Sequence, residues 1–210
     1  MNRFIGVDLG WYGKPSGLAS APLVIRNQSG IRDAERELNR DFRKFHAGCH
    51  AANLGRPFSK NVTAFSQALE ELGFKHGASI SLKQKGRFQI EVHPHAASVS
   101  LFELDRIVKY KRGARSERAR ELRRFRSLLL RRLPELEPGM TLRLPVVPRS
   151  GVLKPVEDMI DAVFCAYIGA YWWRWGKRKN RLYGNEESGY VVVPARYQMK
   201  KAPRDSRCLS

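Results

Sequence analysis

The chain has 210 residues, enough for one domain with a hydrophobic core, and its 42% hydrophobic and 28% charged residues exclude a disordered chain. Lysine and arginine outnumber aspartate and glutamate by 39 to 20, which gives a formal net charge of +19. Such an excess predicts a polyanionic partner, nucleic acid first and an anionic membrane surface second. The alternative is a basic protein whose charge serves solubility alone.

Periodicity of apolar residues divides the chain into strands and helices. Short β-branched or alternating runs predict strands and extended segments, in chain order, over residues 3–10, 18–25, 87–95 and 189–194. Runs with a helical period predict helices over residues 31–46, 61–74, 116–132 and 156–175. This alternation predicts a single α/β layered domain over residues 1–194. Residues 195–210 are expected to form a basic, flexible tail.

Particular residues mark where these elements begin and end. Ser29 is the expected N-cap of the first helix, and Gly176 ends the last helix. Pro94 interrupts the third strand, so that this strand ends around Glu91.

The cysteines and the apolar segments indicate the compartment. The three cysteines form neither an even set nor a C-x-x-C pair, which favours reduced thiols. The apolar start of the chain is too short for a signal peptide, and the most hydrophobic window, 159–173, is too short for a membrane span. We therefore predict a cytoplasmic protein that does not bind membranes.

Four acidic residues fall at the ends of predicted elements. Asp8 ends the first strand, Glu91 ends the third, and Asp158 and Asp161 lie one helical turn apart on one helix face. Because sites gather at the carboxyl ends of strands in α/β sheets, these carboxylates are expected to meet and to repel one another unless a cation lies between them. Hard oxygen ligands suit Mg²⁺ or Mn²⁺, and two such ions can support phosphodiester hydrolysis.

Structural roles are the alternative for each acid taken alone. The helix dipole accounts for Asp158 in a first turn, whereas Asp161 interrupts an apolar run in which burial without a partner is costly. His95 is the candidate proton shuttle beside the acids. His46, Cys49 and His50 have the spacing of zinc ligands but lack a fourth ligand in sequence, so structural zinc is disfavoured.

Basic residues are densest around the third helix. Residues 106–132 contain twelve lysines and arginines, opposed by Glu117 and Glu121, and predict phosphate contacts rather than only a solvated helix face. Within 171–183, four aromatic residues stand beside further cations and could stack on unpaired bases, although about two of these rings are expected in the core: Tyr171, Trp172, Trp173 and Trp175. The predicted nucleic-acid contacts are Lys109, Lys111, Arg112, Arg115, Arg118, Arg123, Arg174, Lys177 and Arg178.

Several stretches carry a resemblance to a known family. "FIGVDLGWYGKPSGLA", "APLVIRNQSGIRDAE", "HAGCHAAN", "IEVHPHA", "LFELDRIVKYKRG" and "VEDMIDAVFCAYIGAYWWRWG…GYVVVP", in this order, resemble domain of unknown function 429. Its members are described as predicted nucleases with an RNase H-like fold, a central mixed sheet flanked by helices. "DMIDAVFCA" is also similar to the last helix of Holliday-junction resolvases, which share that fold.

The resemblance implies a role for each acid. It assigns Asp8 to the first-strand aspartate, Asp158 and Asp161 to the final helix, and Glu91 to the family's E-V-x-P-H motif. It thus implies a metal-dependent nuclease of RNA or DNA that uses Mg²⁺ or Mn²⁺.

The chain also departs from the family pattern. Related sequences have a further segment after Ala19, and Ser20 stands where they have an aspartate. The resemblance therefore implies a sheet with one or two strands fewer, and leaves open a catalytically weakened or inactive nucleic-acid-binding protein. "GVDLG" also opens actin-like phosphotransferases, but the second glycine-rich phosphate loop of that class is missing from the sequence.

Overall fold

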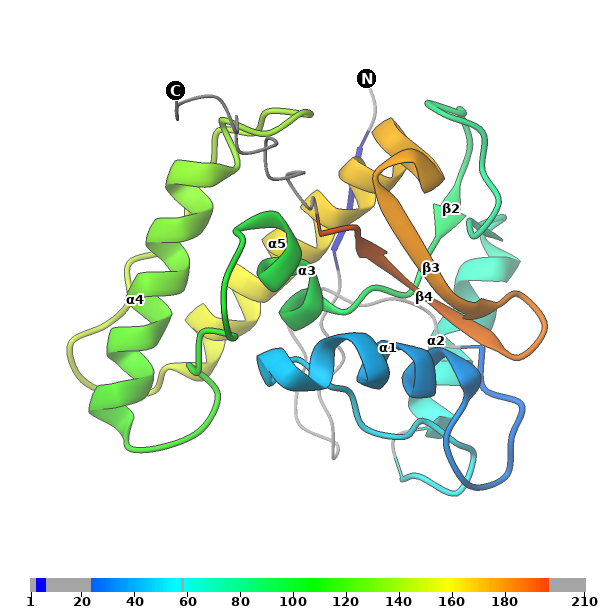
Figure 1. Ribbon diagram of the computed structural model, residues 1–210, viewed down its shortest axis with the longest axis horizontal. Coiled ribbons are helices and arrows are strands. Elements are labelled where there is room, and N and C mark those ends of the chain that lie inside the picture. The colour runs from blue at the N-terminus through cyan, green and yellow to red at the C-terminus, as the bar shows by residue number, and fades with distance from the viewer. Residues whose placement is uncertain (1–2, 7–23, 58, 197–210) are drawn as a thin grey trace, which may run out of the picture.

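The protein is a mixed α/β structure in which helices surround a small set of strands (Figure 1). The computed structural model describes residues 3–6, 24–57 and 59–196. The helices are α1 (Asp33–Phe42), α2 (Ser59–Glu71), α3 (Pro94–Leu101), α4 (Arg115–Arg132) and α5 (Lys154–Trp175), with short 3₁₀ turns η1 (Arg43–Phe45) and η2 (Gly176–Arg178). The strands are β1 (Lys75–His76), β2 (Phe88–Gln89), β3 (Asn180–Asn185) and β4 (Gly189–Pro194).

The described strands pair in both directions. β3 and β4 form an antiparallel hairpin, and β1 pairs with β2 in parallel. A parallel bridge between Val92 and Val192, with the Val192 N–H donating to the Glu91 carbonyl at 2.8 Å, places the segment after β2 beside β4. The expected α/β class is therefore confirmed, and the described strands form two separate two-stranded sheets.

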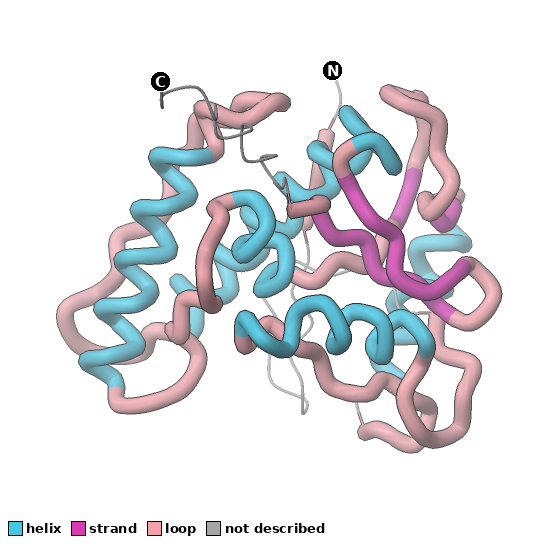
Figure 2. Tube along the Cα trace, viewed as in Figure 1, coloured by secondary structure: helices cyan, strands magenta, loops and turns pink. Residues whose placement is uncertain are grey.

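Helices cover both faces of the β3–β4 hairpin. Val191 and Val193 of β4 pack with Leu38 of α1, whereas Val192 packs with Trp172 of α5. This alternation follows from the pleat, which sends successive side chains to opposite faces. Figure 2 shows α1 running alongside the magenta hairpin.

A second part of the core lies between α4 and α5. Leu122, Phe125 and Leu129 of α4 are buried with Ile160 and Phe164 of α5. The rings of Phe125 and Phe164 meet edge to face, with centroids 5.5 Å apart. Residues spaced by one or two turns thus give α4 one apolar stripe, while its other faces carry arginines.

The boundaries of the four predicted helices agree with the structure to within a few residues, and β4 agrees in full. Ser29 does not cap α1, which begins after Arg32, and this is a correction. The predicted strand over 87–95 is reduced to β2 and the bridge at Val92, because α3 begins at Pro94, a residue that suits the first helical position.

Parts of the fold differ from those expectations. Residues 3–6 and 24–25 are not in strands, and the rest of the two predicted N-terminal strands lies outside the described residues. α3, β1 and β3 were not predicted from the sequence. Among the described helices, none has the length and apolar character needed to cross a membrane.

Candidate carboxylate centre and basic surface

Asp161 lies on the buried side of α5 and is held by two consecutive residues. Its side chain is 2% exposed. The Tyr110 hydroxyl donates to Asp161 Oδ1 at 2.5 Å, and Lys111 Nζ lies 2.7 Å from Oδ2. The ring of Tyr110 stacks on Phe125 of α4, with centroids 5.0 Å apart. This stacking fixes the position of the hydroxyl and therefore the orientation of the carboxylate.

The neighbouring acids of α5 also have basic partners. Asp158 is buried and pairs with Lys154, one turn earlier on the same helix. Glu157 is buried as well and lies 3.0 Å from Arg118 of α4. Asp158 and Asp161, one helical turn apart, are therefore both buried on α5, and each has a lysine beside it.

Glu91 is held by an arginine from α1's N-cap. Arg32 Nη2 donates to Glu91 Oε1 at 2.9 Å and Nη1 donates to Oε2 at 3.1 Å, while Arg32 Nε donates to Glu35 at 2.6 Å. Burial raises the pKa of Glu91 to about 7, and the positive charge of Arg32 acts in the opposite direction. Burial disfavours the charge of Arg32, but Glu91 and Glu35 outweigh it and raise the arginine pKa.

The structure does not bring Glu91 to the aspartates of α5. Val92 packs against Cys165 and Ala162 of α5, whereas the side chain of Glu91 reaches Arg32. Within the described residues, no three histidine, cysteine, aspartate or glutamate side chains are grouped so that they could hold a metal ion.

Asp8 lies outside the described residues. Gly6, two positions before it, packs so closely on α5 that an added Cβ would lie 2.0 Å from the Ala162 carbonyl oxygen. The described start of the chain therefore reaches α5 one residue after Asp161, and only glycine fits there.

His95 lies next to the tyrosine that holds Asp161. The ring centroids of His95 and Tyr110 are 5.8 Å apart, and those of His93 and His95 are 6.1 Å apart. Burial and the nearby charge of Lys111 lower the pKa of His95 to about 4; burial and His95 lower the pKa of His93 to about 3. Both imidazoles are therefore neutral near pH 7, the form that can accept a proton.

The aspartates fit a hard divalent cation in donor type. Their carboxylate oxygens are the ligands that Mg²⁺ and Mn²⁺ prefer, and the two side chains share one helix face. The positions beside these oxygens are held by Lys111 and Lys154, whose side chains are 37% and 41% exposed. Asp158 and Asp161 thus qualify as two ligands, whereas Glu91 is bound to Arg32.

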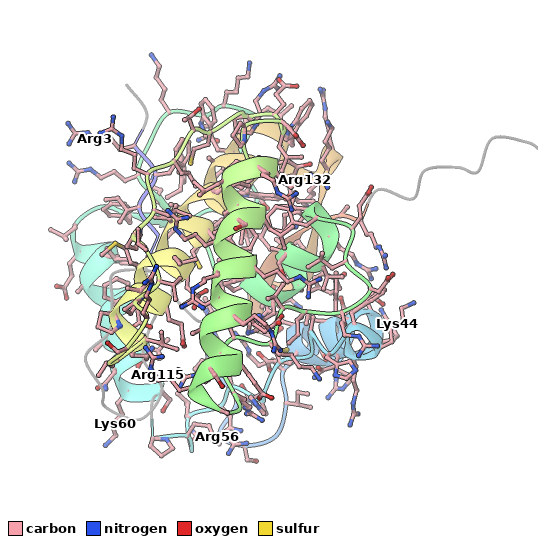
Figure 3. The ribbon with its side chains drawn as sticks, turned by 90° about the vertical axis from the view of Figure 1, so that its left-hand side faces the viewer. Arg3, Lys44, Arg56, Lys60, Arg115 and Arg132 are labelled. Atoms are coloured by element: carbon pink, nitrogen blue, oxygen red, sulfur yellow. The ribbon has the colours of Figure 1, made fainter. Side chains whose placement is uncertain are left out.

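Some arginines of α4, the helix in front in Figure 3, form hydrogen bonds within the protein itself. Arg115 Nε donates to the Gly151 carbonyl at 2.7 Å, and Arg126 donates to the Pro145 and Leu144 carbonyls at 2.7 and 3.0 Å. These arginines attach the segment between α4 and α5 to the helix. In the sequence nothing distinguishes them from the arginines that face solvent.

Other predicted contact residues are exposed. Arg123 and Arg131 are the α4 arginines with neither an acidic nor a carbonyl partner in the described part of the chain, and Lys109 and Arg112 are exposed just before the helix. Lys177 and Arg178, also exposed, line a shallow hollow of about 450 Å³ beside Trp172 and Leu82. We define the basic surface by the exposed cations on α4 and just before it, Lys109, Arg112, Arg123 and Arg131.

The aromatic cluster divides into buried and partly exposed rings. Tyr171 and Trp172 are in the core, which confirms that about two of these rings are structural. Trp175 is partly exposed, with Arg174 and Lys179 within 4.3 and 3.6 Å of its ring centre. Arg174 also pairs with Glu137, so this predicted contact residue already has an acidic partner.

A family profile described as protein of unknown function (DUF429) matches residues 4–188. The match covers most of the chain, which therefore belongs to that family. No curated protein and no solved structure matches the chain.

Proposed function

We propose that this DUF429 member is a metal-dependent nuclease of RNase H-like fold, which binds RNA or DNA on its basic surface and cleaves phosphodiester bonds near the aspartates of α5. The observation that carries the proposal is the burial of Asp158 and Asp161 one turn apart in an otherwise apolar helix segment. Both carboxylates have lysine partners, but a buried ion pair can often be replaced by apolar side chains without loss of stability, so stability alone does not require these aspartates.

The RNase H-like part of the proposal has support in the strand arrangement. Parallel and antiparallel pairs occur together, and helices pack on both faces of the β3–β4 hairpin. Asp158, Asp161 and Asp8 are the proposed metal ligands, whereas Glu91 is left out because both of its carboxylate oxygens bind Arg32. A bound Mg²⁺ or Mn²⁺ would supply an activated water and stabilise the leaving oxygen.

The chain's own residues prepare this site. Tyr110 orients Asp161 through a short hydrogen bond, and the stacking on Phe125 keeps that donor in place. His95 lies beside Tyr110 and is neutral near pH 7, but with a pKa of about 4 it is a weak base there. The basic surface contributes the attraction to phosphates, which is strong at low salt and screened at high salt.

The second candidate is a nucleic-acid-binding protein without catalysis. It is favoured by the pairing of each described candidate carboxylate with a lysine or arginine, which neutralises the site without a metal. Ser20, which stands in place of the family's aspartate, also favours a protein without catalysis.

A panel of labelled RNA, DNA, hybrid and junction substrates separates the two candidates. Fluorescence anisotropy in chelator measures binding, and gel analysis after addition of Mg²⁺ or Mn²⁺ measures cleavage. The proposal expects binding in chelator and cleavage that requires the metal. Tight binding with no cleavage at any metal concentration would establish the second candidate instead, and the absence of binding at low salt would exclude both.

A further inference from the structure

Lys111 is the basic partner of the buried Asp161 carboxylate. Its ammonium lies 2.7 Å from Asp161 Oδ2, whereas the Tyr110 hydrogen bond goes to the other carboxylate oxygen, Oδ1. Asp161 is 2% exposed and Lys111 is 37% exposed. The carboxylate therefore cannot turn to water, whereas the lysine, on a flexible four-carbon stem, can.

We propose that Lys111 is an internal counter-ion of Asp161, which a divalent cation displaces when it binds, while Tyr110 keeps the carboxylate in position. The proposal rests on the metal site proposed above and adds a positioning and regulatory role that the sequence pattern does not assign. The sequence predicts Lys111 only as a phosphate contact. The ammonium of Lys111, once displaced from Asp161, is then able to contact a phosphate.

Electrostatics explains why such a counter-ion would be retained. A buried aspartate without a partner would take up a proton or destabilise the fold. A lysine compensates the charge while the metal is absent, and a dication with twice its charge can replace it. Lys154 has the same relation to Asp158, within one helix. The two lysines thus predict a protein that stays folded without metal and binds metal more weakly than its carboxylates alone would.

Removal of the ammonium tests the proposal. Lys111→Met should raise the affinity for Mn²⁺, measured by isothermal titration calorimetry, by about tenfold, because the ion no longer competes with a bound charge. Lys111→Arg should bind Mn²⁺ as the wild type does. Lys109→Met is the matched control, since Lys109 is exposed two residues earlier and makes the same change in net charge.

Thermal unfolding gives a readout that is independent of cleavage. Without metal, Lys111→Met should melt below the wild type and Lys109→Met near it. Addition of Mn²⁺ should raise the melting temperature of Lys111→Met more than that of the wild type or of Lys109→Met. If Lys111→Met fails to fold, Lys111→Gln, which keeps a polar side chain of similar reach, takes its place.

The outcomes separate this inference from the proposed function. Equal Mn²⁺ affinities for Lys111→Met, Lys109→Met and wild type would overturn the counter-ion role and leave the metal site standing. Absence of Mn²⁺ binding in all of them, including Lys111→Met, would overturn the metal site itself and the inference with it. Tighter binding in Lys111→Met alone, lost again on adding Asp161→Asn, supports both.

Discussion

Arg32 and Glu91 lie 59 positions apart and form a two-pronged ion pair, with N–O distances of 2.9 and 3.1 Å, that joins the start of α1 to the segment after β2. Arg32 also holds Glu35, so one buried guanidinium serves two buried carboxylates. The Arg32 side chain is 1% exposed. This contact gives Glu91 a structural role in the described part of the molecule.

Loss of Arg32 should therefore destabilise the fold strongly. Arg32→Met leaves Glu91 and Glu35 buried without a cation. We therefore expect this substitution to lower the free energy of unfolding, measured by urea denaturation, by about 3–5 kcal/mol. Arg36→Met is the control, because Arg36 pairs with Asp33 in solvent, and it should cost less than about 1 kcal/mol. Similar losses for both variants would show that the buried pair is not the stronger contact.

The hydrogen bond between Tyr110 and Asp161 should contribute more than a neutral one. Tyr110→Phe removes a donor to a buried carboxylate and is expected to cost about 1.5–3 kcal/mol in urea unfolding. Tyr190→Phe removes a hydroxyl that donates to the Gln89 carbonyl at 3.1 Å, and should cost about 0.5–1.5 kcal/mol. The prediction fails if Tyr190→Phe is the more destabilising change.

Acid should unfold the protein partly through His95. In the unfolded chain this imidazole takes a proton near the ordinary histidine pKa of 6.5, whereas in the folded chain its pKa is about 4. The unfolded state therefore binds more protons between these values, and the stability that the neutral histidine contributes above pH 6.5 is lost as pH falls. His95→Gln should show a smaller loss of unfolding free energy between pH 7 and pH 4 than the wild type.

Between pH 7 and pH 4, protonation of Glu91 changes the free energy of unfolding in the direction opposite to that of His95. Its pKa is about 7 in the folded chain, against 4.5 for an ordinary glutamate, so its contribution favours the folded state as pH falls from 7. Because Glu91 is present in both proteins, the difference between His95→Gln and wild type isolates the histidine. An identical pH dependence in the two would contradict the predicted role.

Two arginines of α4 should separate stability from binding. Arg126 donates to the Leu144 and Pro145 carbonyls, whereas Arg123 is exposed and has no ion pair among the described residues. Arg126→Ala should speed hydrogen exchange in residues 140–151 and leave nucleic-acid affinity almost unchanged. Arg123→Ala should weaken binding at low salt and reduce the slope of log affinity against log salt by about one, without affecting exchange. The reverse assignment would contradict the proposed basic surface.

The helices were predictable from the sequence because their signals are local. α4 has an apolar stripe at helical spacing, whereas α5 is a long, almost continuously apolar run that Gly176 ends as expected. β3 escapes prediction because the stretch after η2 is rich in charged and polar residues, and its pairing with β4 is a tertiary contact. α3 escapes prediction because a proline can break a strand as well as begin a helix, and Pro94 does the second.

The candidate site was only partly predictable for a related reason. The spacing of Asp158 and Asp161 is a local pattern, and both residues are buried in the structure. Their partners come from elsewhere: Tyr110 and Lys111 precede α4, and Arg32 reaches Glu91 across the fold. A count of charges cannot show which cations are used inside the protein, so the sequence predicts Arg115 and Lys111 as phosphate contacts alone.

Single-turnover cleavage with Mn²⁺ tests the central claim most directly, on the substrate of the panel that binds most tightly. Asp161→Asn keeps the shape of the side chain and removes its charge, whereas Asp105→Asn makes the same change at an exposed position. The nuclease proposal expects Asp161→Asn to bind the substrate and to cleave it at least about 100-fold more slowly than Asp105→Asn, because a metal ligand is lost. Equal cleavage rates in the two variants would contradict it.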